Sequence, residues 1–273
     1  MTWHRSLLLT TLLLAGCGSA PVRTQAEAQP PATPDQAAAL AADVQRVHGQ
    51  AAAVTADLLV RVKPDGADAE IFQLHLWCAD DGRIHLEATR LEVPFIRALV
   101  QADGHFAAEL VQSREVVHGT LADLAERDAQ GKPLGLPFLT YLTLLVSEAK
   151  AGPVPTGTTP ASPAADTLSF TEPASGLAAV LTVDHASHQA VAKRLSDASG
   201  APVLTLEYGK YQAFDLLNRA SRVKLVVAGD SGEYSLRLRE LRAVPAISDE
   251  GMRFAPPAGL KEITPAEFLQ RLH

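Results

Sequence analysis

The 273-residue sequence predicts a mainly β protein of the α+β class, in which short helices cover one face of an antiparallel sheet. Apolar and polar residues alternate along most segments from residue 54 onward, and turns rich in Gly and Asp separate these segments. Two other segments, 35–53 and 138–150, instead carry apolar residues at helical spacing. Because strands with one apolar face need a cover, we expect these two helices to provide it.

The first helical segment, residues 35–53, begins after a proline with an aspartate that can cap a helix. Leu40, Val44 and Val47 recur at helical spacing, and the segment is rich in alanine, the best helix former. We therefore expect a helix with one apolar stripe over this range.

The segments after this helix predict a meander of strands. "AEIFQLHLWCADDG" alternates apolar with polar residues, ends in an Asp-Asp-Gly turn and leads into "RIHLEATRLEV". Near the C-terminus, "RVKLVVAGDSGEYSLRLRELRAV" predicts a hairpin in which Leu236 and Leu238 alternate with Arg237 and Arg239. Such strands fit a sheet with one covered and one solvated face. Cys78 is expected to be a small buried residue within its strand.

The second helical segment, 138–150, follows a proline and is the most apolar helix expected in the mature chain. The loop 152–166 after it is rich in Pro and Thr. At the C-terminus we expect a short helix with Thr264 as its cap and Pro265 in its first turn. The sequence thus predicts one domain over residues 35–273, with this helix and loop inserted.

The N-terminus resembles that of a bacterial lipoprotein. Its apolar stretch is shorter than the roughly 20 residues that a membrane-spanning helix needs. The sequence Leu14-Ala15-Gly16-Cys17 at its end resembles the lipobox. This resemblance implies that residues 1–16 are a signal peptide and that Cys17 carries lipid. Residues 17–34, rich in Ala, Pro, Gln and Thr, then form a flexible tether.

The charge of the chain argues against a nucleic-acid partner. The formal net charge is −7, and it becomes more negative after removal of residues 1–16, whose charged residue is Arg5. Nucleic-acid-binding domains instead carry a basic face.

Two short motifs could suggest catalysis. Gly229-Asp230-Ser231-Gly232 matches the sequence around the serine of trypsin-like proteases, but it lies between two alternating strands, where these residues favour a turn. Asp184-His185-Ala186-Ser187-His188 offers two imidazoles, yet its strand-like surroundings also favour a turn. We expect no enzyme, no catalytic residue, no cofactor and no metal. A hydrolase using Ser231 or His185 remains an alternative.

Basic residues gather on the polar face of the last predicted hairpin. This face either meets an acidic partner or a lipid headgroup, or is a solvated surface balanced by Glu233 and Glu240. The basic residues are Arg237, Arg239, Arg242 and Lys224.

The order of these features resembles the LolA/LolB-like lipoprotein-carrier superfamily: a lipobox, a tether, an Ala-rich helix, meander strands, an apolar helix, a loop and closing strands. The resemblance covers most of residues 38–263. It includes a closing pattern of Leu236, Leu238, Leu241, Phe254, Pro257 and Gly259. The resemblance implies an open antiparallel half-barrel with a helical lid over an apolar cavity, and a non-enzymatic carrier of lipids or acylated proteins.

The sequence therefore predicts a membrane-anchored lipoprotein of the bacterial cell envelope, on the periplasmic face of the outer membrane. It would bind the acyl chains of a lipid or acylated protein as a carrier or receptor. The alternative is a scaffold lipoprotein that docks an envelope protein through its sheet and exposes a large apolar patch. The residues expected to line the cavity are Leu58, Val60, Phe72, Leu74, Leu76, Phe138, Leu142, Leu145, Leu204, Leu206, Leu225, Leu236 and Leu238.

Overall fold

The predicted alternation of strands and tight turns builds one large sheet. The computed structural model describes residues 34–63, 65–66, 68–120, 123, 167–172, 177–229 and 231–271. These residues belong to one unit, Pro31–His273. The predicted signal peptide, the tether with Cys17, the helix 138–150 and the loop 152–166 lie outside the described residues.

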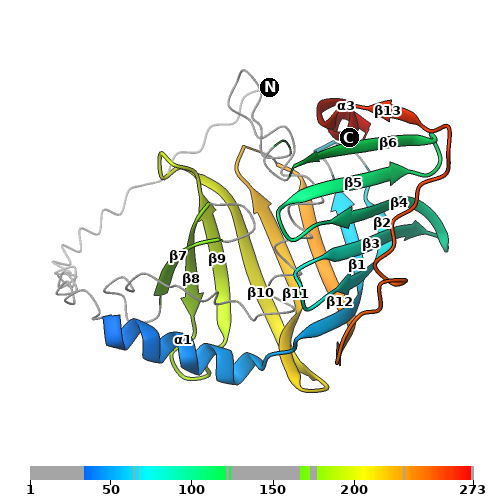
Figure 1. Ribbon diagram of the computed structural model, residues 1–273. Coiled ribbons are helices and arrows are strands. Elements are labelled where there is room, and N and C mark those ends of the chain that lie inside the picture. Colours follow the sequence, from blue (N-terminus) through cyan, green and yellow to red (C-terminus); the bar gives the residue numbers. More distant parts are fainter. Residues whose placement is uncertain are drawn as a thin grey trace, which may run out of the picture. The chain divides into compact units, whose positions relative to one another are not determined.

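Two meanders of consecutive strands make up most of the sheet (Figure 1). The N-terminal meander consists of β1 (Ala53–Lys63), β2 (Glu70–Cys78), β3 (Ile84–Arg90), β4 (Val93–Val100), β5 (His105–Leu110) and β6 (Glu115–Thr120). The C-terminal meander consists of β7 (Thr167–Thr171), β8 (Ala178–Val183), β9 (Ala190–Ser196), β10 (Pro202–Phe214), β11 (Leu217–Val227) and β12 (Glu233–Val244).

The two meanders meet at the centre of the sheet, where β1 pairs with β12. The short strand β13 (Lys261–Ile263) adds in parallel to β6, so the thirteen described strands follow the order β13-β6-β5-β4-β3-β2-β1-β12-β11-β10-β9-β8-β7. β13 and β7 are the two edges, and the described strands do not pair across them. The sheet is therefore open, as the sequence predicted.

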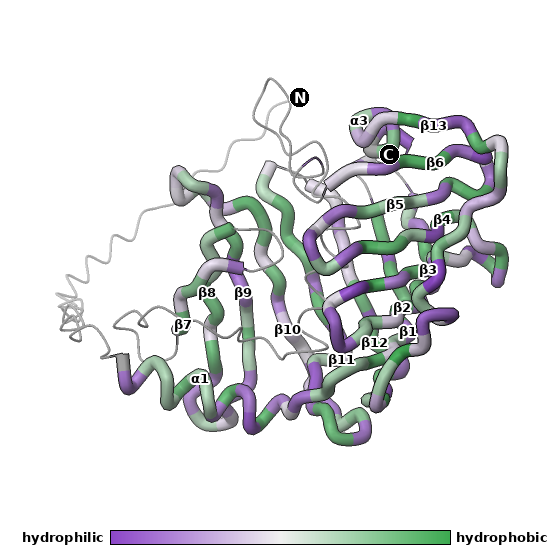
Figure 2. Tube along the Cα trace, in the orientation of Figure 1, coloured by the Kyte–Doolittle hydropathy of each residue, from purple (hydrophilic) through white to green (hydrophobic). Residues whose placement is uncertain are grey.

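One face of the sheet carries the apolar side chains. Burial alternates along the strands, for example in β2, where Phe72, Leu74, Leu76 and Cys78 are buried and the residues between them are half-buried. Figure 2 shows hydrophobic residues following the strands and hydrophilic residues gathering at many turns. The prediction that Cys78 is a small buried residue is confirmed, because it has no exposed surface.

The first helix, α1 (Pro34–His48), is shorter than predicted. The sequence predicted a helix through residue 53, but the chain leaves the helix at Gly49, which has a φ of 71°. A Cβ atom at this position would lie 2.4 Å from the carbonyl oxygen of Leu216. Glycine tolerates both the left-handed conformation and the close approach, so it ends the helix here. The helix packs against β7 and β11, and Val44 on its apolar stripe is fully buried.

The C-terminal helix, α3 (Pro265–Arg271), starts as predicted. The Thr264 hydroxyl accepts a hydrogen bond from the Glu267 backbone N–H at 3.2 Å, and the Glu267 carboxylate accepts one from the Thr264 backbone N–H at 2.8 Å. This reciprocal pattern is a capping box. The helix packs against β6, next to the edge strand β13.

Candidate functional site

The candidate binding surface is the apolar face of the sheet. Nine of the residues predicted to line a cavity are buried on this face, with exposed fractions between 0 and 7 %: Leu58, Val60, Phe72, Leu74, Leu76, Leu204, Leu206, Leu225 and Leu236. Leu238 is half-buried and packs against the same core. The remaining three, Phe138, Leu142 and Leu145, lie outside the described residues.

The strand register brings these residues into continuous rows across the sheet. One row crosses six strands through the partners Leu238, Leu58, Leu74, Ala88, Ile96 and Leu110. On the other side of β12, Leu236 pairs with Val223, and Leu225 pairs with Leu206. The predicted residues from both meanders therefore belong to one apolar surface.

A polar opening interrupts the sheet between β11 and β12. The two strands pair from Leu225↔Tyr234 to Arg222↔Arg237, whereas β12 continues to pair with β1 as far as Val244. Beyond Arg222 and Arg237 the strands thus separate. A pocket of about 380 Å³ lies at this separation, and we call it the basic pocket. It is lined by Lys210, Gln212, Ser221, Arg222, Arg237, Leu238 and Arg239.

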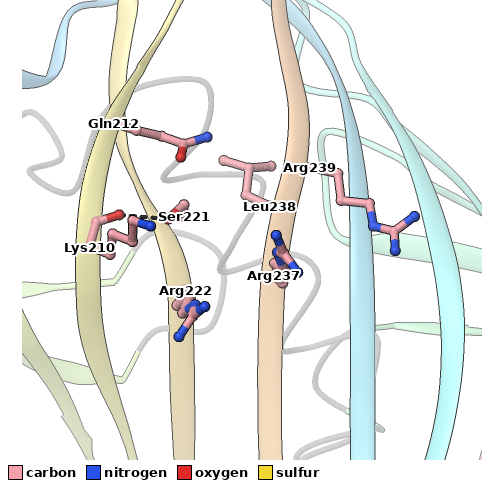
Figure 3. A pocket seen from close by; sticks show the side chains of 7 residues that line it. All are labelled: Lys210, Gln212, Ser221, Arg222, Arg237, Leu238 and Arg239. Atoms are coloured by element: carbon pink, nitrogen blue, oxygen red, sulfur yellow. Dashed lines mark hydrogen bonds between the residues drawn. The ribbon is translucent and has the colours of Figure 1, made fainter.

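Side chains from three neighbouring strands form the basic pocket (Figure 3). Gln212 of β10 and Leu238 of β12 extend toward each other across the opening, while Arg239 extends over β1. Ser221 is buried, and its hydroxyl donates a hydrogen bond to the Lys210 carbonyl oxygen at 2.7 Å. The Lys210 backbone has a φ of 52°, a conformation that is uncommon for residues other than glycine.

The β3–β4 turn exposes an apolar tip. Its two residues, Leu91 and Glu92, both have positive φ values, 50° and 66°. Two-residue hairpins of this kind strongly favour Asn and Gly. Leu91 nevertheless occupies the turn with 92 % of its surface exposed, and Val93 and Ile71 are 55 % and 52 % exposed. An exposed leucine in a strained turn is a candidate contact for an apolar surface.

Ser231 and His185, the residues of the hydrolase alternative, lie apart. Ser231 lies in the β11–β12 turn and His185 in the β8–β9 turn. The strands β8 to β12 pair antiparallel in chain order, so successive turns alternate between the two ends of the strands. These two turns are consequently at opposite ends, and an 11-residue strand such as β11 spans roughly 35 Å. Both motifs occupy turns, as the sequence predicted.

The histidines of β2, β3, β5 and β6 are dispersed over the sheet. His75 Nδ1 lies 2.6 Å from Asp57 across two neighbouring strands, and His85 Nδ1 lies 2.9 Å from the Gly251 carbonyl oxygen. No group of three or more metal-ligating side chains occurs among the residues that the structure describes. Within the same residues, no helix has the length and apolar character needed to cross a membrane.

His48 joins the end of α1 to the C-terminal meander. Its ring is 1 % exposed, and Nε2 accepts a hydrogen bond from the Ala190 backbone N–H at 3.4 Å. The buried Arg219 guanidinium donates to the His48 carbonyl oxygen and, at 3.3 Å, to that of Gly49. Burial, and secondarily the charge of Arg219, lower the pKa of His48 from 6.5 to about 4. The imidazole is therefore neutral at pH 7.

The sequence interpretation singled out Arg237 and Arg239 but missed the other polar residues of the basic pocket, Lys210, Gln212, Ser221 and Arg222. One signal was available. Arg222 lies seven residues before Gly229 and Arg237 five residues after Gly232, so the predicted hairpin places both arginines near the same level, although only the observed register makes them direct partners. The opening itself carried no such signal, because it depends on where β11 and β12 stop pairing.

The arrangement of these elements defines a class of fold, an open antiparallel sheet built from two meanders with an apolar face. No protein-family model matches the sequence, and no curated protein matches it either. Solved structures do share the fold. A LolA superfamily protein from Nitrosomonas europaea superposes with a TM-score of 0.54 at 10 % identity, covering 80 % of this chain and 97 % of that one.

Two further structures support the same fold. A DUF1329 family protein from Desulfovibrio piger gives a TM-score of 0.54 at 11 % identity, covering 80 % of this chain and 96 % of that one. A domain from Vibrio parahaemolyticus that carries the name outer membrane lipoprotein-sorting protein gives 0.51 at 13 % identity, covering 80 % and 95 %. The resemblance to the LolA-like superfamily inferred from the sequence is thereby confirmed at the level of the fold.

Proposed function

We propose that this protein is a membrane-anchored lipoprotein that binds the acyl chains of a lipid or acylated protein and acts non-enzymatically as a carrier or receptor. The observation that carries the proposal is the continuous row of apolar partners across six strands of an open sheet. The fold, which LolA superfamily proteins and a lipoprotein-sorting domain share, supports it.

Hydrophobic burial is sufficient for such binding. Each buried methylene contributes about 0.8 kcal/mol, so a fully enclosed 16-carbon chain gains on the order of 10 kcal/mol before the costs of binding. A surface made of leucine, valine and phenylalanine side chains supplies the required environment without a catalytic group. Binding and release of the chain then depend only on how the apolar surface is covered.

The connection between the two meanders supports a cover for this surface. β6 ends at Thr120 beside one edge of the sheet, and β7 begins at Thr167 at the opposite edge. The apolar segment 138–150 belongs to this connection, and we propose that it is the helical lid, with Phe138, Leu142 and Leu145 toward the apolar face.

We further propose that Cys17 carries the lipid anchor and that the protein acts in the bacterial cell envelope, at the periplasmic face of the outer membrane. The lipobox-like sequence supports the anchor, and the Vibrio lipoprotein-sorting domain supports the compartment. A lipid with two or three chains holds a protein firmly on a bilayer. Residues 17–34 would then separate the sheet from the membrane surface.

Native mass spectrometry of a soluble Cys17→Ala form, purified from bacterial membranes without detergent, tests the proposal. We expect a bound lipid on this form and on Gln73→Trp, whose side chain lies on the opposite face of β2. If Leu74 lines the proposed apolar cavity, Leu74→Trp should fold with nearly unchanged stability but lose the lipid, because the larger side chain fills that cavity. A lipid-free protein in which Leu74→Trp costs the 1–3 kcal/mol typical of overpacking would reject the proposal.

The apolar tip at Leu91 favours a second candidate function, the docking of a membrane surface or an acylated envelope protein. Substituting Leu91→Asn removes the exposed side chain and places a residue that tolerates positive φ in the turn. If the tip docks a partner, this variant stays folded but loses binding to vesicles or to the acylated protein. Unchanged binding would show that the tip is only a turn.

A further inference from the structure

The basic pocket concentrates positive charge in an acidic protein. Of the seven described residues that line it, four are cationic and none is acidic. Arg222 and Arg237 are direct cross-strand partners, an arrangement in which like charges destabilise a sheet. The whole chain has a formal net charge of −7. The stability of the sheet therefore does not explain why these cations lie together.

The neighbouring carboxylates do not neutralise the pocket. Glu233 lies 3.1 Å from Arg61, and Glu207 lies 3.5 Å from Lys224. Glu240, at the next position along β12 from Arg239, accepts hydrogen bonds from Arg242. The sequence analysis allowed Glu233 and Glu240 to balance the basic face of the hairpin. Glu240 does pair with Arg242 of that face, and Glu233 pairs with Arg61, so neither carboxylate forms an ion pair with a cation of the basic pocket. Among the described residues, no acidic side chain forms an ion pair with any of the four cations, Lys210, Arg222, Arg237 and Arg239.

We propose that the basic pocket binds a phosphate group. Guanidinium groups bind phosphate oxygens through paired, charge-assisted hydrogen bonds, and Arg222 and Arg237 project from adjacent strands at one level. Gln212 supplies amide donors from the other side of the opening. A phosphate with up to two negative charges matches several cations better than a carboxylate with one. The pocket volume of about 380 Å³ leaves room for the group that carries the phosphate.

The phosphate can belong either to a free compound or to a lipid headgroup. Leu238 lines the pocket and also packs against the buried core, so the polar opening and the apolar face meet at this residue. An amphiphile could place its phosphate in the pocket and its chains along the apolar face. This second source rests on the proposed function, whereas the phosphate site itself does not.

Isothermal titration calorimetry on the soluble Cys17→Ala form separates these sources. The probes are glycerol 3-phosphate, the short-chain lipid dihexanoylphosphatidic acid, whose phosphate is likewise a monoester, and acetate as a carboxylate of low charge. Arg222→Gln and Arg237→Gln remove pocket cations, and Arg242→Gln removes a cation of the same strand, β12, that already pairs with Glu240. Fluorescence of the uncharged probe N-phenyl-1-naphthylamine reports binding at the apolar face independently.

We expect both phosphate compounds to bind, and each pocket substitution to weaken them by about tenfold or more, as loss of a charge-assisted hydrogen bond requires. Arg242→Gln should bind like the parent. Much tighter binding of the short-chain lipid than of glycerol phosphate identifies a headgroup, and equal binding identifies a free phosphate. The proposal is overturned if neither phosphate compound binds more tightly than acetate, or if Arg242→Gln weakens binding as much as the pocket substitutions.

The two proposals fail separately. If the naphthylamine probe binds and the phosphate compounds do not, the phosphate site is rejected and the apolar site stands. If glycerol phosphate binds and the naphthylamine probe does not, the phosphate site stands and acyl binding is rejected.

Discussion

The two meanders of the sheet differ in how their charged side chains pair across neighbouring strands. In the N-terminal meander, cross-strand partners carry opposite or complementary charges, as in Glu87↔Arg97, which form an ion pair at 2.8 Å. The C-terminal meander also has such a pair, Glu207↔Lys224, but there Arg222 faces Arg237, and Lys193 and Arg219 are buried in the same meander. Folding alone explains the first pattern, because paired charges stabilise a solvated sheet face. Lys193 and Arg219 have structural partners, but the Arg222↔Arg237 pair adds a cost that folding does not need, which supports a role in binding.

The largest expected effect comes from the buried ion pair of the C-terminal meander. Lys193 and Glu172 are each 1 % exposed and form a salt bridge with each other. Lys193→Met leaves a buried carboxylate without its cation, so we expect a loss of about 3–5 kcal/mol in the free energy of unfolding. Urea denaturation measures it.

A matched pair in the N-terminal meander sharpens this result. Arg97→Gln removes one partner of a half-exposed ion pair and should cost about 1 kcal/mol or less. The double variant Lys193→Met/Glu172→Met should recover much of the loss, since it leaves no buried charge. Equal costs for Lys193→Met and Arg97→Gln would contradict the contrast between the two meanders.

The second prediction concerns the apolar packing of the N-terminal meander. Leu74 has no exposed surface at the centre of β2, so Leu74→Ala should cost about 2–5 kcal/mol if the protein's own atoms surround it. Ile71→Ala, at a 52 % exposed position of the same strand, should change stability by less than about 0.5 kcal/mol. Denaturant titration of both variants, with and without bound lipid, distinguishes a position packed by the protein's own side chains from one that lines a ligand-filled cavity. A small cost for Leu74→Ala without lipid would indicate a hollow.

The third prediction uses pH to loosen α1 from the C-terminal meander. The pKa of His48 is about 4 in the folded protein and 6.5 ordinarily, so the unfolded chain binds a proton that the folded chain excludes. The contribution of neutral His48 to the free energy of unfolding is complete above pH 6.5. It is lost as the pH falls toward 4, by at most about 3 kcal/mol. His48→Gln should abolish this part of the pH dependence in thermal unfolding, whereas His105→Gln, at an exposed position, should keep it.

Local patterns in the sequence predicted much of this fold. The alternation in β2 and β12, the capping residues of α3 and the turn at Gly229 all depend on neighbouring residues, and the structure confirms them. The alternation rule fits β9 poorly, because Lys193 occupies a buried position in this strand, where it forms an ion pair with Glu172. The end of α1 was misplaced because alanine propensity extends past Gly49.

The candidate site was only partly predictable. The apolar lining residues follow from strand alternation, but the pairing of β1 with β12 joins residues that are far apart in sequence. The separation of β11 from β12 depends on β12 continuing along β1, which no local pattern encodes. The basic pocket therefore emerges only when the whole sheet is assembled, although its arginines were visible in the sequence.

The smallest expected effect tests whether the charges of the C-terminal meander serve binding rather than folding. Replacing Arg222 or Arg237 by Gln removes a like-charge pair, so each variant should be more stable than the parent by about 0.2–1 kcal/mol in the absence of ligand. For a domain of this size, that corresponds to a rise of roughly 0.4–4 °C in the midpoint of thermal unfolding at low salt. High salt should reduce the difference, because it screens exposed charges. A phosphate ligand should reverse the order of the midpoints by stabilising only the parent.

Arg97→Gln, which breaks an opposite-charge pair, should instead lower the midpoint of thermal unfolding. If Arg222→Gln and Arg237→Gln also lower it without ligand, these arginines contribute to the fold and the contrast between the meanders is wrong.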